Sequence, residues 1–199
     1  MKNEINRIAG RLVKAFNTNT VINPIPVKYC KNINLANKLR KLCEDQIKDE
    51  TIGIKAGGTG IQALKKLKEK EPFTAKVFKK RLVKSGQKVK INQHTKGIEV
   101  EVYYFIKKSF FDFKGKVTKS NVTKFIKFMG PCFEIVGFRQ RNKKFTYLGD
   151  ICGDFGFNIK FVVGRKTKFK KLNLNNLKTS LVSKKNGVKV NGNTNIVYI

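Results

Sequence analysis

The chain has 199 residues, of which 44 are Lys or Arg and only 13 are Asp or Glu, so its formal net charge is +31 at pH 7. A compact protein with this much unbalanced charge repels itself, which favours a polyanionic partner such as nucleic acid. With 40% hydrophobic residues, the chain is too apolar for a disordered basic tail and can bury a core. No apolar run approaches the roughly 18 residues of a membrane-spanning helix, so we expect no membrane span.

The first part of the chain has the pattern of a helical protein. Apolar residues from Asn3 to Phe16 fall on one stripe with basic residues opposite, which predicts an amphipathic helix. A short strand over Thr51–Lys55 is expected to enter the cluster Gly57–Gly60, from which another helix leaves. The helices expected in this part span Asn3–Phe16, Leu35–Lys48, Ile61–Lys70 and Phe73–Lys84.

Beyond Ser85 the hydrophobic period changes from that of helices to that of strands. The alternation over Ile98–Ile106 predicts a half-buried antiparallel strand. One short helix is expected over Lys119–Met129, and Asn191 with Gly192 forms a hairpin signal in the tail. The strands expected here span Lys88–Asn92, Ile98–Ile106, Cys132–Phe138, Lys144–Leu148 and Phe155–Val163.

These patterns predict an α+β protein in three parts. Residues 1–84 form a helical or α/β part with a Gly-rich loop, residues 85–163 an α+β part dominated by antiparallel strands, and residues 164–199 a basic extension without any acid. The four cysteines stand at wide, unpatterned spacings, which indicates reduced and mostly buried thiols rather than a disulfide framework. These residues are Cys30, Cys43, Cys132 and Cys152.

The glycine cluster is the first candidate site. Its backbone N–H groups and the following helix could face an anion, with side-chain help from neighbouring polar residues. The spacing also resembles the Gly-x-x-Gly loop that clamps RNA backbone in KH domains, although that family places the loop between two helices. A tight turn, RNA-backbone contact and small-nucleotide binding remain three alternatives. The candidate residues are Lys55, Gly57, Gly58, Thr59 and Gly60.

Clusters of basic residues, with Phe residues beside them, are the second candidate site. Each phosphate that such a cluster neutralises releases counterions, so several clusters predict strong, salt-sensitive binding to RNA. The expected RNA-binding residues are Lys79, Lys80, Arg81, Arg139, Arg141, Lys143, Lys144, Arg165, Lys166, Lys168, Lys170 and Lys171.

Residues for catalysis are harder to find. Glu134, Asp150 and Asp154 fall near predicted strands, and Asp154 followed by Lys160 is distantly similar to the acids and lysine of metal-dependent nucleases. The spacing of that pattern is absent, so turn or capping roles are favoured for Asp150 and Asp154. The single histidine, His94, does not make a zinc site with scattered cysteines. We therefore expect no catalytic residue, no metal site and no cofactor.

The composition as a whole is similar to that of ribosomal proteins. Lys, Asn, Ile and Phe are frequent, with 37 Lys against 7 Arg, which is typical of proteins encoded in AT-rich mitochondrial genomes. This resemblance implies a non-enzymatic constituent of the mitochondrial ribosome, or of the cytoplasmic ribosome of an AT-rich organism. Its partners would be ribosomal RNA and neighbouring ribosomal proteins. A metal-dependent nuclease or a sequence-tolerant DNA-binding protein is the alternative.

Overall fold

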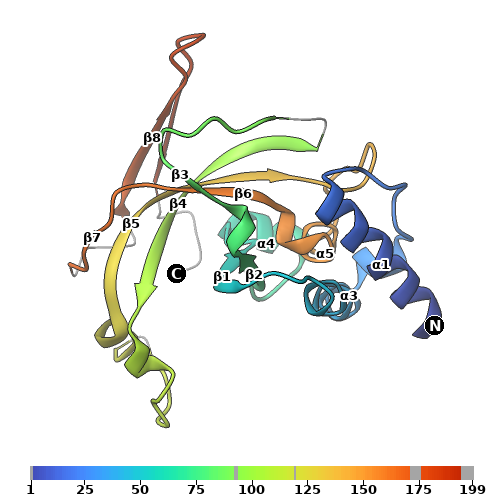
Figure 1. Ribbon diagram of the computed structural model, residues 1–199, viewed down its shortest axis with the longest axis horizontal. Coiled ribbons are helices and arrows are strands. Elements are labelled where there is room, and N and C mark those ends of the chain that lie inside the picture. Colours follow the sequence, from blue (N-terminus) through green and yellow to red (C-terminus); the bar gives the residue numbers. More distant parts are fainter. Residues whose placement is uncertain (1, 92–93, 119, 171–175, 194–199) are drawn as a thin grey trace.

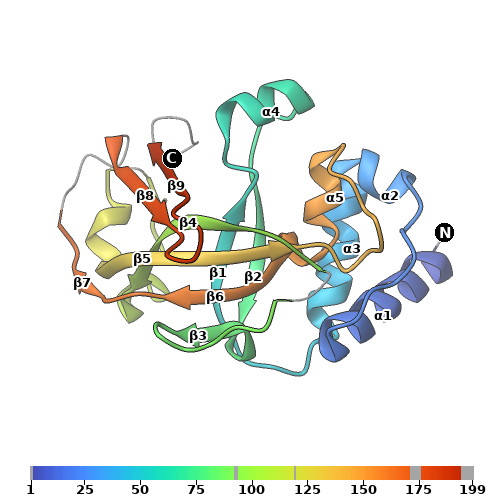
Figure 2. The ribbon, with the colours of Figure 1, turned by 90° about the horizontal axis from the view of Figure 1, so that it is seen from above.

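The fold is α+β, as predicted, with four of its five α-helices gathered at one end of the molecule and a curved sheet extending from them (Figures 1 and 2). The computed structural model describes residues 2–91, 94–118, 120–170 and 176–193. Among these residues, no helix has both the length and the apolar character needed to cross a membrane. The helices are α1 (Lys2–Thr18), α2 (Lys28–Lys31), α3 (Ile33–Asp45), α4 (Ile61–Leu67) and α5 (Leu148–Cys152).

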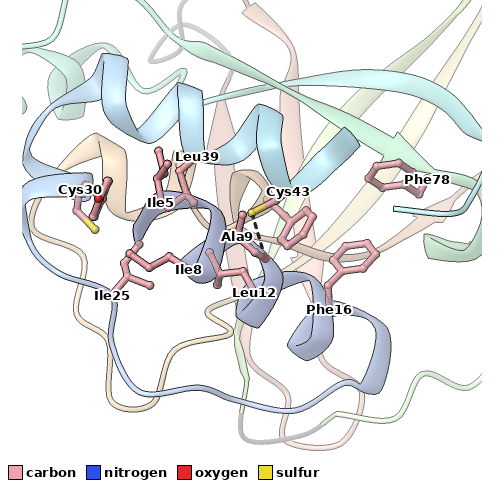
Figure 3. Packing of buried hydrophobic residues seen from close by; sticks show 12 residues of the cluster. Ile5, Ile8, Ala9, Leu12, Phe16, Ile25, Cys30, Leu39, Cys43 and Phe78 are labelled. Atoms are coloured by element: carbon pink, nitrogen blue, oxygen red, sulfur yellow. Dashed lines mark hydrogen bonds between the residues drawn. The ribbon is translucent and has the colours of Figure 1, made fainter. Parts of the chain in front are cut away.

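The helical end contains the main hydrophobic core. The predicted apolar stripe of α1 is confirmed, because its four members are at most 4% exposed and pack against α3 (Figure 3). Asn32 caps α3 by accepting hydrogen bonds from the backbone N–H groups of Asn34 and Leu35, which is the capping preference of this residue type. The four cysteines are free and buried, as predicted. The stripe consists of Ile5, Ile8, Leu12 and Phe16.

The central sheet has the strand order β3-β6-β5-β4, and β7 pairs with the far end of β5. β3 and β6 are parallel, whereas β4, β5 and β6 are antiparallel. β4 and β5 are the long strands that carry the sheet away from the helices (Figure 1). The strands are β3 (Leu82–Lys84), β4 (Thr95–Ile106), β5 (Ile126–Gly137), β6 (Asn158–Val163) and β7 (Thr167–Lys168).

Two further hairpins complete the fold. β1 (Thr51–Gly57) and β2 (Phe73–Phe78) form an antiparallel pair that runs across the sheet, with α4 at its tip (Figure 2). β8 (Lys178–Val182) pairs with β9 (Lys189–Asn193). The hairpin predicted at Asn191–Gly192 is thus misplaced, because these residues lie within β9 and the turn comes before it.

Several predicted elements are wrong. The helix predicted over Phe73–Lys84 is instead β2, the 3-10 helix η1 (Lys79–Arg81) and β3. Phe73 and Ala75 are buried in one core cluster, and Phe78, at the end of β2, is buried in another. The helix predicted over Lys119–Met129 shrinks to the 3-10 turn η3 (Val122–Phe125) before β5. Residues 88–91 and 144–147 are not strands, and the structure does not describe residue 92.

Candidate functional site

Three carboxylates converge on one face of the sheet. Glu99 and Glu101 are two residues apart on β4, so their side chains point the same way. Glu134 on β5 pairs directly with Glu99, which places it on that same face. One carboxylate oxygen from each residue lies within 4.8 Å of the others. We call these three residues the acidic cluster.

Lys55 joins the acidic cluster from another element. The inner face of β1 carries Lys55 over the sheet, and its ammonium donates to both carboxylate oxygens of Glu134 at 2.5 and 2.6 Å. A third hydrogen bond goes to the Gly156 carbonyl at 3.1 Å. The side chains of Lys55 and Glu134 are 11% and 2% exposed. Lys55 is therefore held by a fixed set of partners next to the cluster.

The charges of this site are out of balance. Burial raises the pKa of Glu134 to about 7 even though Lys55 opposes the shift, and Glu99 and Glu101 add to the rise. Desolvation and the Glu99 carboxylate also raise the pKa of Glu101. One lysine thus faces three carboxylates, and additional positive charge at the cluster would relieve their repulsion.

A cavity of about 290 Å³ opens beside the cluster. One wall carries Lys55, Glu99 and Glu101, and the glycine loop 57–60 forms another. The rest is apolar and comes from α4, α5 and the segments next to α5. We call this space the acidic cavity, and the larger residues of its apolar lining are Leu64, Leu67, Phe145, Leu148, Ile151 and Phe157.

The glycine loop fits closely against α5. Gly58 has φ of +72°, and a Cβ atom there would lie 2.5 Å from Leu148 Cδ1. Both features favour glycine at this position. The tight turn that we kept as an alternative is thus present, and the loop forms a wall of the acidic cavity. Of the predicted loop candidates, Lys55 is the residue that the fold places against the acidic cluster.

Two other acids singled out in the sequence have structural roles, as favoured. Asp150 accepts hydrogen bonds from the backbone N–H groups of Thr146 and Tyr147 and so caps α5. Asp154 is fully buried and bonds the Arg139 backbone N–H at 2.8 Å and its guanidinium at 3.2 Å. Neither carboxylate lines the acidic cavity.

The predicted RNA-binding residues differ in burial and in their partners. Arg81 and Arg139 are buried, and the guanidinium of each lies over the ring of Phe16. Lys143 bonds Asp150 at 2.6 Å, and Lys79 pairs with Glu50 on the surface. Lys171 lies outside the described residues. The exposed members are Lys80, Arg141, Lys144, Arg165, Lys166, Lys168 and Lys170.

Comparison with known proteins shows which fold this is. No family model and no curated protein matches the chain. Solved structures of 4-oxalocrotonate decarboxylase from Pseudomonas putida G7 share its fold, at 16% sequence identity and over 99% of this chain. The complex with magnesium and adipate has a TM-score of 0.73 and is covered over 76% of its chain. The complex with calcium and acetate has a TM-score of 0.76 and is covered over 75%.

These likenesses correct the interpretation drawn from composition. The ribosomal assignment is wrong, because the chain has the fold of a metal-binding decarboxylase. The same finding overturns the expectations of a non-enzymatic role and of ribosomal RNA and ribosomal proteins as partners. Net charge reflects mainly the surface residues, and a codon-biased composition reflects the base composition of the genome. Neither determines how buried residues are arranged.

The sequence analysis does not single out the acidic cluster, which is a set of three carboxylates that could hold a metal ion. Glu134 was noticed in the sequence, but Glu99 and Glu101 were interpreted only as the polar positions of an alternating strand. Their spacing was a usable signal, because two acids two residues apart on a strand share a face. That signal becomes specific only when a third acid is paired beside them, as Glu134 is in the structure.

Proposed function

We propose that this protein is an enzyme that uses a divalent metal ion to decarboxylate a small oxo acid. The observation that carries the proposal is the convergence of the acidic cluster and Lys55 at one cavity. The shared fold supports it, since the similar structures are those of a decarboxylase complexed with magnesium or calcium. Each feature alone is common in proteins, whereas their combination is typical of an active site.

The residues present fit a hard divalent cation. Mg²⁺ and Ca²⁺ prefer carboxylate oxygens, and the three closely spaced oxygens of the acidic cluster are of that kind. Glu99, Glu101 and Glu134 would hold the ion, and Glu99 and Glu101 also border the cavity. Bound there, magnesium would act as a Lewis acid toward the oxygens of an oxo acid.

Lys55 is positioned to supply a proton. Its ammonium is held by Glu134 and the Gly156 carbonyl and also lines the acidic cavity. In a decarboxylation, the bond to the carboxyl carbon breaks and carbon dioxide leaves with that carbon. The electron pair of the broken bond stays on the remaining chain, which then takes up a proton. We assign the donation of this proton to Lys55, which regains one from solvent.

The cavity sets the class of substrate. Its volume of about 290 Å³ is near the lower end for small-molecule sites. The charged wall suits the carboxylate and oxo oxygens of an acid, and the apolar wall of α4 and α5 side chains suits a short hydrocarbon chain. We therefore propose a small acid with adjacent oxo and carboxylate groups at one end and an apolar middle.

The test combines metal binding with turnover. We expect Mg²⁺ to bind with one site per chain by calorimetry and Glu101→Gln to weaken binding by roughly 100-fold or more, because one of three anionic ligands is lost. We expect 4-oxalocrotonate, or a related oxo acid, to release carbon dioxide only when Mg²⁺ is present. Lys55→Met should bind Mg²⁺ but lose turnover by about 100-fold or more.

A matched control separates the site from general charge effects. Glu71→Gln removes one exposed carboxylate outside the acidic cavity, so it should leave Mg²⁺ affinity and turnover unchanged. Unchanged Mg²⁺ affinity in Glu101→Gln would overturn the metal site. Full turnover in Lys55→Met would overturn the assigned proton donor.

A further inference from the structure

A second recess lies on another part of the molecule and has the opposite charge. It is formed where the end of α1, the segment 46–49, η1 and β6 meet, and it has a volume of about 620 Å³. A neighbouring recess of about 460 Å³ shares Asn19, Lys90 and Lys160 with it. We call the two together the basic concavity. Its cationic residues are Lys48, Lys80, Arg81, Lys88, Lys90 and Lys160.

Little in the basic concavity offsets this charge. Within the part of the chain that the structure describes, Asp49 is the one acid that lines it. The Asp49 carboxylate accepts hydrogen bonds from the backbone N–H groups of Glu50 and Lys80, at 2.9 and 3.0 Å. Both oxygens of Asp49 thus accept backbone hydrogen bonds, and Asp49 is the one acid beside six cations among the described lining residues.

Arg81 is the most unusual member of the concavity. Its residue is only 8% exposed, and its guanidinium lies 3.6 Å from the centroid of the Phe16 ring. One nitrogen donates to the Phe16 carbonyl at 2.5 Å, whereas Nε has no acceptor among the described residues. Arg81 is in no salt bridge with a described carboxylate, and the charge of Asp49 only partly opposes the lowering of its pKa. A buried cation without an anionic partner is costly.

Lys160 adds a second cation to the same wall. Its ammonium donates to the Lys80 carbonyl at 2.8 Å, which holds it at the edge of η1. Burial and the charge of Arg81 lower the pKa of Lys160. Burial and the charge of Arg139 lower the pKa of Arg81, although Asp49 opposes that shift. Positive groups are thus assembled in a recess where they disfavour one another, and an anion in the recess would relieve that repulsion.

We propose that the basic concavity binds a small anion that bears two or more phosphate groups. Arginine and lysine together form the donor set that recognises phosphate oxygens. The recess is large enough for several phosphate groups, and its cations are spread over both parts. This site shares no lining residue with the acidic cavity, so it does not depend on the proposed function.

The experiment uses inorganic pyrophosphate as the probe and the full chain as the protein. Divalent metal is removed on a chelating resin, because a soluble chelator such as EDTA is itself a polyanion. Calorimetry should show saturable binding of one pyrophosphate per chain, tighter than that of inorganic phosphate. The melting temperature should rise with pyrophosphate concentration.

Variants assign the binding to the concavity. Lys160→Gln should weaken pyrophosphate binding by about tenfold or more, because a charge-assisted hydrogen bond is lost. Arg81→Met should weaken it at least as much, and Lys160→Gln, which changes a partly exposed side chain, keeps the test decisive if Arg81→Met does not fold. Lys66→Gln removes the same charge from an exposed position on α4 and should leave affinity unchanged.

Three outcomes would overturn the proposal. The first is titration without saturation, which indicates diffuse attraction to a basic surface. The second is an equal loss of affinity in Lys160→Gln and Lys66→Gln. The third is a single-stranded oligonucleotide that binds in a Lys160-dependent manner and is not displaced by pyrophosphate, because the ligand would then be a nucleic acid.

Discussion

The acidic cavity and the core of the helical end each contain a buried ion pair, but the two pairs have different surroundings. Arg139 and Asp154 are 3% and 0% exposed at their side chains, and both make further hydrogen bonds to buried groups of the protein. Lys55 and Glu134 are almost as buried, yet two more carboxylates and a cavity adjoin them.

This difference separates structural from functional charge. Burial of an ion pair is by itself weak evidence for a site, because a fully hydrogen-bonded pair is also a normal part of a core. An excess of one sign of charge that faces a cavity has no such structural use. The acidic cluster is such an excess of negative charge. Arg81 and its neighbouring lysines are such an excess of positive charge.

We expect the largest change in stability when the buried ion pair between Arg139 and Asp154 is broken. Asp154→Ala leaves Arg139 buried without its carboxylate, so we expect the free energy of unfolding to fall by about 3–5 kcal/mol in urea titrations. Asp45→Ala removes one partner of the exposed pair with Lys76 and should cost about 1 kcal/mol or less. Similar losses in the two variants would contradict the structural role of Asp154.

We expect a smaller loss of stability from a substitution in the glycine loop that forms one wall of the acidic cavity. Gly58→Ala places a methyl group against Leu148 at a residue with φ of +72°, so we expect a loss of about 1–3 kcal/mol in stability. Gly10→Ala is the control, because it lies within α1 and a Cβ atom there meets nothing within 4 Å. That variant should gain up to about 1 kcal/mol from helix propensity. A stable Gly58→Ala protein would show that the loop relaxes easily.

The smallest expected effect has the opposite sign. Glu101→Gln removes one of three crowded carboxylates, so without metal the protein should become more stable by up to about 1 kcal/mol. Glu71→Gln, at an exposed position, should change stability by less than about 0.5 kcal/mol. Thermal unfolding in metal-free buffer measures both. A clear loss of stability in Glu101→Gln would contradict this expectation, because it would mean that the charge of Glu101 is stabilised by a partner, as that of Asp154 is by Arg139.

Features that depend on neighbouring residues in the chain were predictable from the sequence. The stripe of α1, the strand that carries Lys55 and the glycine loop after it all follow from local periodicity and backbone preference. The buried residues of β2 follow neither period strictly, because positions 73 and 75 fit one strand face whereas 75 and 78 are spaced as on one helix face. Short apolar segments leave that choice to tertiary contacts.

The candidate site was decided by contacts between distant parts of the chain. Lys55 and Glu134 are 79 residues apart, and the register that sets Glu99 opposite Glu134 is a property of two paired strands. A shift of one residue in that pairing would send Glu134 to the other face of the sheet. The sequence by itself thus determined the local elements and the excess of positive charge. Only the tertiary structure decided which charged side chains have a partner of opposite charge, because local periodicity does not specify contacts between distant parts of the chain.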